Sequence, residues 1–316
     1  MANTRSNEPQ VFTLNTPYPV GAVHIYTLHS VGGLVLFDTG PPTPSCFNFL
    51  KSHINLKDLK YLLITHCHAD HYGAAAFIEE HSKTKIVISK NDILKHTQGE
   101  KRIKLTKEIF RSLGFPSKDL TEVESIVKSF LVNFPKNPSP LEDIATEIRT
   151  LGIDYIHCGG HSSDDIVYLT NKYAITGDIL LKGIFQTPLI DVKMESGARF
   201  RSYESYCDTL NKLKKIKKYK ILPGHREVSS VEEIVLFYVS KMFSRIISIK
   251  QCLNNCTVYE TVMKIVKDNN PFKKFIKAGE IAFFKDFLEN PELLKKQLIH
   301  LGIFDNVKNL YLQALI

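Results

Sequence analysis

The sequence lacks long hydrophobic runs. Residues 9–37 contain no Asp, Glu, Lys or Arg, but prolines and glycines interrupt them. No run approaches the ~20 consecutive apolar residues that a membrane-spanning helix needs. We find no signal peptide either. The sequence therefore predicts a protein with no membrane partner.

The sequence also lacks paired cysteines. The spacing Cys-x-x-Cys, which is typical of zinc knuckles and thiol redox sites, does not occur. The six cysteines are instead scattered along the chain, at Cys46, Cys67, Cys158, Cys207, Cys252 and Cys256. We expect reduced thiols and a cytoplasmic location.

Neither sign of charge is strongly in excess. The chain has 316 residues, 43% hydrophobic and 23% charged, with a formal net charge of +8. Dividing the chain at residue 230 leaves +5 before the cut and +3 after it. Neither part is basic enough to indicate nucleic-acid binding by charge alone. The composition excludes disorder, allows one large domain or two unequal ones, and shows no internal repeat.

The first 230 residues alternate between strand-like and helical patterns, which predicts an α/β domain. Asn171-Lys172 separates two of the strands and is typical of a tight hairpin turn. Residues 91–150 differ, with helical periodicity and a proline cluster, and we interpret them as a helical insertion. The predicted strands are Val23–Leu28, Leu34–Phe37, Tyr61–Ile64, Ile86–Ile88, Ile153–Ile156, Ile166–Leu169, Tyr173–Thr176 and Lys220–Leu222.

Residues 231–316 form a second predicted domain, which is mainly helical. Ser230 and Glu233 have the spacing of a capping box ahead of a long amphipathic helix. Further helical patterns cover residues 257–268, 273–289 and 291–301, and a small hairpin is predicted over residues 303–312. The run of lysines between residues 212 and 220 is interpreted as the solvated face of an amphipathic helix rather than an RNA-binding surface.

The segment that carries chemistry is Thr65-His66-Cys67-His68-Ala69-Asp70-His71, directly after a predicted strand. In an extended segment, residues two apart point the same way, so His66 and His68 can bind one ion. Asp70 and His71 follow as the chain turns into a helix, where they can reach a second ion. Cys67 should point to the opposite face, as a structural thiol. The spacing predicts two adjacent metals.

Other candidate ligands follow other predicted strands. His161, Asp178 and His225 each come after a strand and a glycine, and Asp38 ends the strand Leu34–Phe37. Glycine beside them lets the backbone turn tightly or approach a ligand closely. Since strand ends on one edge of a sheet converge on a crevice, we expect these side chains to meet there.

Taken together, these segments resemble the metallo-β-lactamase superfamily. The resemblance rests on five motifs in the family's order: Asp38-Thr39-Gly40, His66-x-His68-x-Asp70-His71, Gly160-His161-Ser162, Thr176-Gly177-Asp178 and Leu222-Pro223-Gly224-His225. It implies an αββα sandwich with a metal site at one edge. The tail after residue 230 resembles, more loosely, the winged-helix-like domain of a subgroup that includes glyoxalase II-like and endoribonuclease-like hydrolases.

The resemblance also implies a ligand set. His66, His68 and His161 would bind a first metal, Asp70, His71 and His225 a second, and Asp178 would bridge the two. Asp38 would orient a ligand loop. Zinc is expected, two per chain, because the ligands are rich in imidazole, with iron and manganese as alternatives.

Two metals roughly 3.5–4 Å apart can lower the pKa of a shared water to about 7 and so provide hydroxide at neutral pH. The sequence therefore predicts a metal-dependent hydrolase of an ester, thioester or phosphoester, with a small-molecule substrate. Asp70 and Asp178 could accept a proton during the attack, although charge neutralisation is their first role.

Two features depart from the family pattern. Ser163, Asp164 and Asp165 follow the His161 motif where relatives often carry proline and another histidine, and Arg226 replaces a common glycine. Both changes alter the wall of the site. Arg226, together with Arg199 and Arg201, is a candidate for binding an anionic group.

Two alternatives stay open. One is a metal-dependent ribonuclease or nucleic-acid-binding protein. The other is a mononuclear iron enzyme of the persulfide dioxygenase kind, which would use His66, His68 or His161 with Asp178. The sequence does not predict the oligomeric state.

Overall fold

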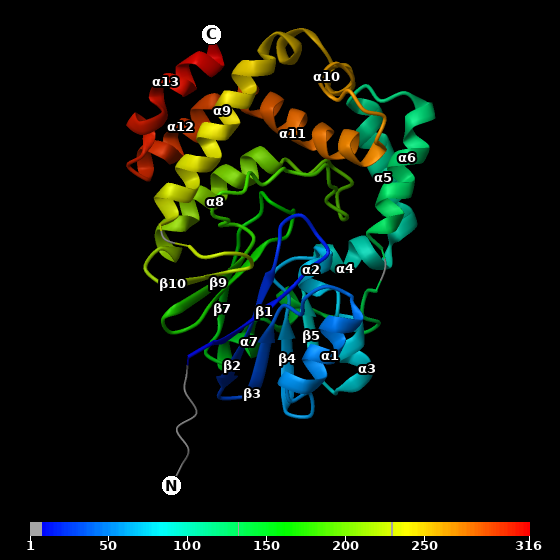
Figure 1. The fold of residues 1–316 in the computed structure, drawn as a ribbon, viewed down its shortest axis with the longest axis vertical. Coiled ribbons are helices and arrows are strands. Elements are labelled where there is room, and N and C mark those ends of the chain that lie inside the picture. The colour runs from blue at the N-terminus through cyan, green and yellow to red at the C-terminus, as the bar shows by residue number, and fades with distance from the viewer. Residues whose placement is uncertain (1–7, 132, 229) are drawn as a thin grey trace.

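A computed structural model describes residues 8–131, 133–228 and 230–316 of the chain. Its centre consists of two β-sheets (Figure 1). The larger sheet has the order β1-β2-β3-β4-β5-β6, in which β2 is antiparallel to both β1 and β3, and β3 to β6 run parallel. Its strands are β1 (Gln10–Leu14), β2 (Val23–Ser30), β3 (Gly33–Phe37), β4 (Leu59–Leu63), β5 (Lys85–Ile88) and β6 (Ser139–Pro140).

The smaller sheet has the order β10-β9-β8-β7. Strand β10 is parallel to β9, while β8 is antiparallel to both β9 and β7. The predicted hairpin turn at Asn171-Lys172 is confirmed, because it connects the antiparallel strands β8 and β9. The strands are β7 (Asp154–His157), β8 (Ile166–Leu169), β9 (Tyr173–Gly177) and β10 (Lys220–Pro223).

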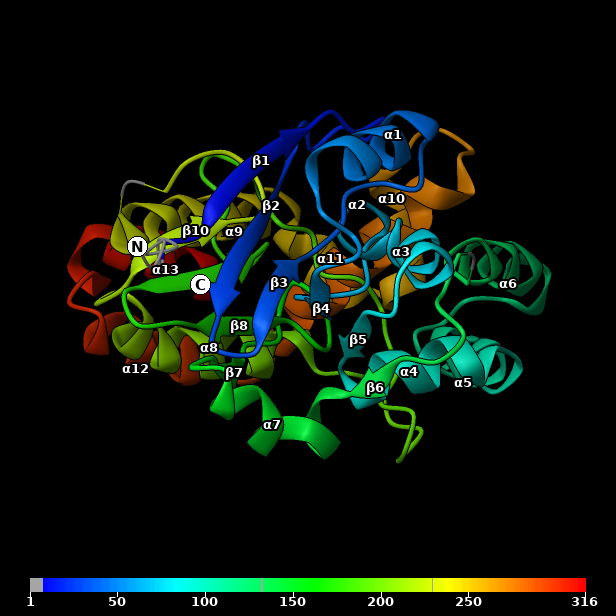
Figure 2. The same cartoon turned by 90° about the horizontal axis from the view of Figure 1, so that it is seen from below.

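The two sheets pack face to face because their central strands are apolar on both sides. In β3, Leu34 and Leu36 join a cluster that includes α1 (Pro44–His53) and α3 (Ala75–His81). The alternate residues Val35 and Phe37 pack instead against the smaller sheet. A continuous apolar run with period two thus builds two cores at once. Figure 2 shows this layering from below.

Helix α8 (Ser202–Ile216) covers the outer face of the smaller sheet. Tyr206, Leu210 and Leu213 are buried, as their spacing predicts, and the lysines of this segment lie on the opposite, solvated side. The layers are therefore helix, sheet, sheet, helix. The predicted αββα sandwich is confirmed, as are all eight predicted strands; β1 and β6 were not predicted.

The predicted insertion over residues 91–150 is helical up to residue 129 and again from residue 141 to 150. Between these two parts, strand β6 pairs with β5 at the edge of the larger sheet. Strand β6 has only two residues. A run this short shows no hydrophobic periodicity, so the sequence could not reveal it. The elements are α4 (Lys90–Thr97), α5 (Gly99–Ser112), the 3₁₀ helix η1 (Ser117–Asp119), α6 (Leu120–Ser129), the 3₁₀ helix η2 (Leu141–Ile144) and α7 (Ala145–Thr150).

Residues 231–316 consist of helices and turns, with no strand anywhere in that fully described range. The Ser230 hydroxyl accepts a hydrogen bond from the Glu233 amide and caps the first helix, as predicted. The mainly helical character is confirmed, and the helices are α9 (Val231–Asn255), α10 (Val258–Ile265), α11 (Pro271–Glu289), α12 (Pro291–His300) and α13 (Phe304–Leu315).

The predicted hairpin over residues 303–312 is wrong, since α13 occupies this segment. Val307, Tyr311 and Ala314 are buried at spacings of four and three residues, which is a helical period and not the alternation of a strand. Without a hairpin, these residues lack the strands of a wing, so the winged-helix-like description does not hold. The domain boundary near residue 230 falls between β10 and α9 and stays a prediction.

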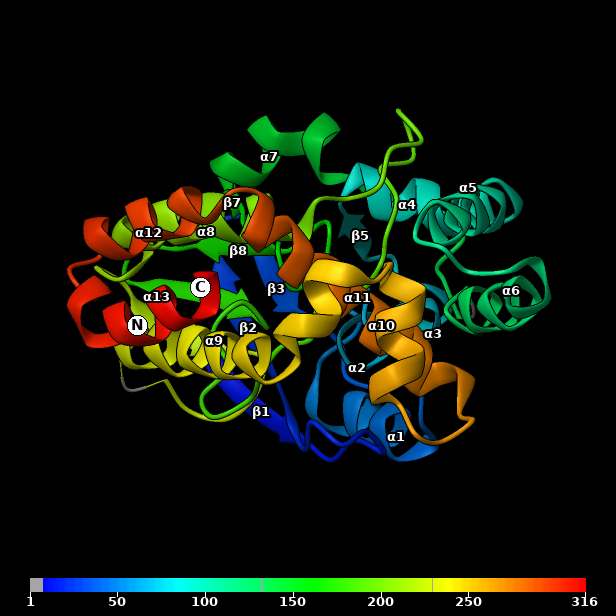
Figure 3. The ribbon, with the colours of Figure 1, turned by 90° about the horizontal axis from the view of Figure 1, so that it is seen from above.

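One edge of the sandwich collects the ends of five strands. Strands β3 and β4 are parallel, β9 and β10 are parallel, and β7 runs with β9 because both oppose β8. Helices α9 to α13 lie over this edge, at the top of Figure 1 and nearest the viewer in Figure 3. None of the helices in the described ranges is both long and apolar enough to cross a bilayer.

Candidate metal centre

Three histidines from two loops form the first group at this edge. Nδ1 of His68 lies 3.0 Å from Nε2 of His66 and 3.0 Å from Nε2 of His161. His66 and His68 follow β4, while His161 follows β7. Three ring nitrogens that converge on one point match the imidazole coordination of a transition metal.

A second group comes from the start of α2 (Ala69–Tyr72) and the end of β10. Nε2 of His225 lies 3.3 Å from Oδ2 of Asp70 and 3.3 Å from Nε2 of His71. His71 and His225 are fully buried, and Asp70 is 7% exposed. Within each group, the ligand atoms all lie within 4.8 Å of one another.

Asp178 stands between the two groups. Its Oδ1 lies 3.3 Å from Nε2 of His71 and 3.6 Å from Nε2 of His225, and its Oδ2 lies 3.7 Å from Nε2 of His161. Oδ1 is buried and has no hydrogen-bond partner. Burying a charged oxygen without a partner is energetically costly. A cation on each side of Asp178 would offset this cost.

Hydrogen bonds to His71 and His225 fix which nitrogen of each ring carries hydrogen and which carries the lone pair. Nδ1 of His225 is 2.6 Å from the Ala22 carbonyl oxygen, so that nitrogen must carry the hydrogen. Nδ1 of His71 likewise donates to Oδ2 of Asp38 at 2.7 Å. In the neutral rings both Nε2 atoms then present lone pairs to each other. A cation between them resolves this conflict, so the donor set fits a bound metal.

Asp38 holds two ligand loops at once. Besides His71, its carboxylate accepts hydrogen bonds from the Thr65 amide and hydroxyl, both at 2.8 Å. Thr65 immediately precedes His66. Asp38 has a φ of 58°, which turns its side chain from the end of β3 toward both loops. The predicted orienting role therefore matches the geometry.

Glycine lets the β10 loop approach the site. A Cβ on Gly224 would lie 2.4 Å from Oδ1 of Asp178 and 2.6 Å from Cε1 of His71. The amide of Gly224 also donates to the Gly177 carbonyl at 2.7 Å, which fixes the two loops side by side. Any larger residue at position 224 would displace candidate ligands.

The His161 loop is closed by the residues that depart from the family pattern. Oδ2 of Asp165 accepts the Ser162 amide at 2.7 Å, and Oδ1 accepts the Ser162 hydroxyl at 2.9 Å. The Asp165 carbonyl also accepts the Cys158 amide at 2.7 Å. These hydrogen bonds of Asp165 hold the turn that carries His161.

Burial keeps two of the imidazoles neutral. It lowers the pKa of His68 to about 3 and the pKa of His66 well below its ordinary value, and neighbouring histidines add to both effects. A metal ligand must be unprotonated, so these rings are ready to bind at neutral pH.

The carboxylates of the site are ionised. Burial alone would raise the pKa of Asp178 and that of Asp70, but the charge of His71 outweighs it and lowers both. Burial would lower the pKa of His71, whereas Asp178, Asp38 and Asp70 raise it well above its ordinary value. The three carboxylates thus favour a positive charge at this point. Either a proton on His71 or a bound dication would supply it.

The structure brings together all of the side chains that the sequence singled out as ligands. These are His66, His68, Asp70, His71, His161, Asp178 and His225. Their roles as ligands, and the catalytic roles of Asp70 and Asp178, stay predictions. Cys67 belongs to none of the converging groups among the described residues, but it lines the cavity beside them, so a purely structural role stays a prediction.

The three arginines that were predicted to bind an anionic group contact other parts of the chain. Arg199 pairs with Asp286 at 2.6 Å, and Arg201 lies 3.1 Å from the same carboxylate, so both attach α11 to the chain ahead of α8. Nη1 of Arg226 donates to the Lys182 carbonyl at 2.9 Å. The expectation for Arg199 and Arg201 is wrong, because their guanidinium groups are held by carboxylates of the second helical region.

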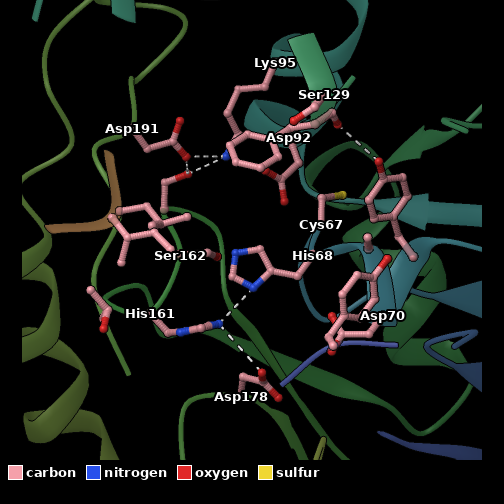
Figure 4. Close-up of a pocket in the computed structure, with 18 of the residues that line it drawn as sticks. Cys67, His68, Asp70, Asp92, Lys95, Ser129, His161, Ser162, Asp178 and Asp191 are labelled. Carbon is pink, nitrogen blue, oxygen red and sulfur yellow. Dashed lines mark hydrogen bonds and ion pairs between the residues drawn. The ribbon is translucent and has the colours of Figure 1, made fainter. Parts of the chain in front are cut away.

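A cavity of about 450 Å³ opens beside the metal centre (Figure 4). His68, Asp70, His161 and Asp178 line one end of it. The volume lies within the range of small-molecule sites.

The sequence did not indicate a buried lysine in the wall of this cavity. Lys95 is 4% exposed, and its ammonium lies 2.5 Å from Asp92, 2.8 Å from Asp191 and 3.3 Å from Asp164. It also donates to the Ser163 hydroxyl at 2.6 Å. On α4 alone, the Asp92–Lys95 spacing is that of an ordinary exposed helix pair, so no local signal reveals it.

Comparison with known proteins identifies related sequences. Residues 18–225 match the family described as the metallo-beta-lactamase superfamily. The chain is 24% identical over 298 residues to a probable metallo-hydrolase, YqjP, of Bacillus subtilis, covering 88% of this chain and 91% of that protein. It is 26% identical over 215 residues to the probable metallo-hydrolase MJ0888 of Methanocaldococcus jannaschii, covering 66% and 89%.

Solved structures share the fold beyond the matched family region. A metallo-beta-lactamase family protein, TTHA1429, of Thermus thermophilus superposes with a TM-score of 0.69 at 19% identity, covering 90% of this chain and 94% of that one. A beta-lactamase domain protein of Burkholderia ambifaria gives 0.66 at 14% identity, covering 90% and 87%. Both superpositions extend over most of this chain.

Proposed function

This chain belongs to the metallo-beta-lactamase superfamily, and we propose that it is a dinuclear zinc hydrolase that cleaves an ester, thioester or phosphoester of a small molecule. Its relatives are named as metallo-hydrolases, and its His/Asp cluster is compatible with a metal site. The number of ions, their identity and the bond cleaved are the content of the proposal.

The placement of Asp178 carries the proposal. One carboxylate oxygen faces His71 and His225, and the other faces His161 on the opposite side. A carboxylate that bound a single ion would not need one oxygen beside each group of ligands. With three ligands on each side and Asp178 between them, the chain has enough donors for two ions.

Zinc is favoured by the chemistry of the donors. Five of the seven candidate side chains are imidazoles, and the other two are carboxylates. Imidazole suits zinc better than the hard cations magnesium and calcium. In this chain, His66 and His68 are kept neutral by burial, as metal ligands must be.

When bound, a pair of zinc ions provides hydroxide at neutral pH and polarises the oxygen of the substrate. The chain supplies the rest. His68, Asp70, His161 and Asp178 line the cavity, so a carbonyl or phosphoryl group placed there meets the site directly. Water adds its oxygen to the acyl carbon or phosphorus, the bond to the leaving oxygen or sulfur breaks, and the leaving group takes up a proton. Asp70 and Asp178 are the carboxylates that can carry this proton.

The test combines metal removal with a substrate panel. Metal would be stripped with a chelator and restored with zinc, and hydrolysis of an acyl thioester, an aryl ester and an aryl phosphodiester would be followed. We expect hydrolysis of one of these substrate classes to disappear when the metal is removed and to return when zinc is added. Asp178→Asn should lose turnover by at least ~100-fold, comparable to the loss of a strong electrostatic contribution. Asp154→Asn, an exposed carboxylate on β7, is the matched control.

Each alternative has its own outcome. Activity that survives complete metal removal would end the proposal. One iron per chain with oxygen consumption would indicate a persulfide dioxygenase-like enzyme instead. If Asp178→Asn kept affinity for RNA while no hydrolysis was found, the protein would be a nucleic-acid binder.

A further inference from the structure

We propose that the substrate of the metal centre carries an extended apolar group on one side of the scissile bond, and that this group occupies the cavity beside the centre. This inference rests on the proposed function, and it names the substrate class: esters or thioesters with a medium-length alkyl or aryl chain.

The cavity joins the metal centre to the helical parts of the chain. At one end, Asp70, His161 and Asp178 form its wall; toward the other lie Lys95 and Asp191, as Figure 4 shows. A group that reacts at the metal centre can therefore extend into this space and be sheltered from water.

The walls away from the metals are mainly apolar and aromatic. They come from the end of α6, from the loop of residues 184–190 and from the first turns of α11. Six of the lining side chains are Phe130, Phe185, Leu189, Phe272, Phe275 and Ile276. Phe272 lines the cavity and is 47% exposed, so this part of the apolar wall is open to solvent.

These walls are preformed. Phe275 stacks on Phe110 of α5 with ring centroids 5.2 Å apart. Phe185 stacks on Tyr238 of α9 at 4.7 Å, and the Tyr238 hydroxyl donates to the Gln186 carbonyl at 3.0 Å. Because three helices hold the walls in place, the cavity does not close up, and apolar surface stays open to a ligand.

The loop is also seated directly on α11. A Cβ on Gly279 would lie 2.0 Å from the Pro188 carbonyl oxygen, so only glycine allows this approach. The absence of a side chain at this position brings Leu189 and Ile276 to the same cavity.

The charges in the wall do not favour an anionic ligand. Among the described lining residues, the Lys and Arg side chains are Lys95 and Arg102. Lys95 is surrounded by carboxylates, and Arg102 lies 3.6 Å from Asp191. Since these cations are already neutralised, a phosphate-rich strand such as RNA would find little attraction here.

The first experiment is a chain-length series on the zinc-loaded protein. One arm keeps the leaving group and lengthens the acyl chain from acetyl to octanoyl; the other keeps acetyl and lengthens the alcohol or thiol. We expect kcat/KM to rise about fourfold per methylene in one arm until the cavity is filled, as full burial of a CH₂ predicts. The rising arm tells which side of the bond lies in the cavity. Flat profiles in both arms would overturn the inference.

A paired substitution locates the effect. Ile276→Trp should reduce the chain-length dependence by ~10-fold or more at octanoyl, because the indole occupies the space. Ile299→Trp makes the same change on the exposed face of α12, where Ile299 is 56% exposed, and should leave the profile unchanged. An unaltered profile in a folded Ile276→Trp protein would contradict the assignment, and the wild-type series decides alone if that variant does not fold.

A binding measurement separates this inference from the proposed function. Octanamide and acetamide, which carry no charge, would be titrated into the zinc-loaded protein by calorimetry. Octanamide binding without any hydrolysis would overturn only the proposed function. Hydrolysis without a preference for octanamide over acetamide would overturn only the apolar cavity.

Discussion

Nε2 of His71 faces Nε2 of His225 across 3.3 Å, and both rings use Nδ1 as a hydrogen-bond donor. This arrangement directs two lone pairs at the same point in a fully buried place. It is unfavourable for neutral rings and favourable around a cation. The short distance between these two Nε2 atoms therefore explains why a positive charge is favourable here.

Metal removal should destabilise the protein as well as inactivate it. A ligand that binds only the folded state at 1,000 times its Kd contributes about 4 kcal/mol. For a chain of this size, its loss should lower Tm by about 5–10 °C. Calorimetry with and without chelator measures the change. Asp178→Ala is the control, because a protein that cannot hold the metals should not respond; an unchanged Tm after verified metal loss would contradict the account.

Asp38→Asn should weaken metal binding without removing a ligand. In the carboxylate, Oδ2 accepts from His71 and the Thr65 hydroxyl while Oδ1 accepts from the Thr65 amide; Asn has a single oxygen, so its NH₂ group would face one of these donors. Loss of such an orienting partner typically costs 10–100-fold in metal affinity. Competition with a chromogenic chelator measures it, with Asp154→Asn as the exposed match. Equal affinities in the two variants would show that Asp38 does not orient His71.

Gly224→Ala should abolish hydrolysis although it adds one methyl group. The new Cβ would meet Asp178 and His71 at 2.4 and 2.6 Å, and the backbone there is tied to Gly177. Gly152→Ala is a useful comparison, since its φ of 76° makes alanine strained but leaves open space around it. We expect it to lose about 1–2 kcal/mol of stability and to keep its metals. Full activity in Gly224→Ala would show that the loop can move aside.

Lys95→Met should unfold the protein more easily than any surface substitution. It leaves Asp92, Asp164 and Asp191 without their shared cation, and breaking a buried pair costs about 3–5 kcal/mol. Lys90→Met removes the exposed pair with Glu195 and should leave the unfolding midpoint almost unchanged, because solvent screens this pair. Urea unfolding of both variants measures the difference, and similar midpoints would mean that water reaches the Lys95 cluster.

The sequence predicted the metal centre because its residues obey local rules. His66 and His68 alternate after a buried strand, and His161, Asp178 and His225 each follow a strand with glycine beside them. The parallel direction of these strands then brings them to one edge. Every step depends on periodicity or on turn chemistry, which a sequence shows directly.

The cavity could not be predicted in this way, since it depends on contacts between distant segments. Gly279 of α11 meets Pro188, and Phe275 meets Phe110, across long stretches of chain. Lys95 is paired with Asp191 far along the chain, and the residues near Asp191 show no periodic pattern. The misassigned segment at residues 303–312 has a related cause, because short apolar runs do not separate strand from helix until their packing is known.

The most direct test of the account is a crystal structure of the zinc-loaded protein with anomalous data at the zinc edge. The account predicts two peaks per chain, one beside His66, His68 and His161 and the other beside Asp70, His71 and His225, with Asp178 touching both. A single peak under zinc saturation, or two peaks that leave Asp178 without contact, would contradict it.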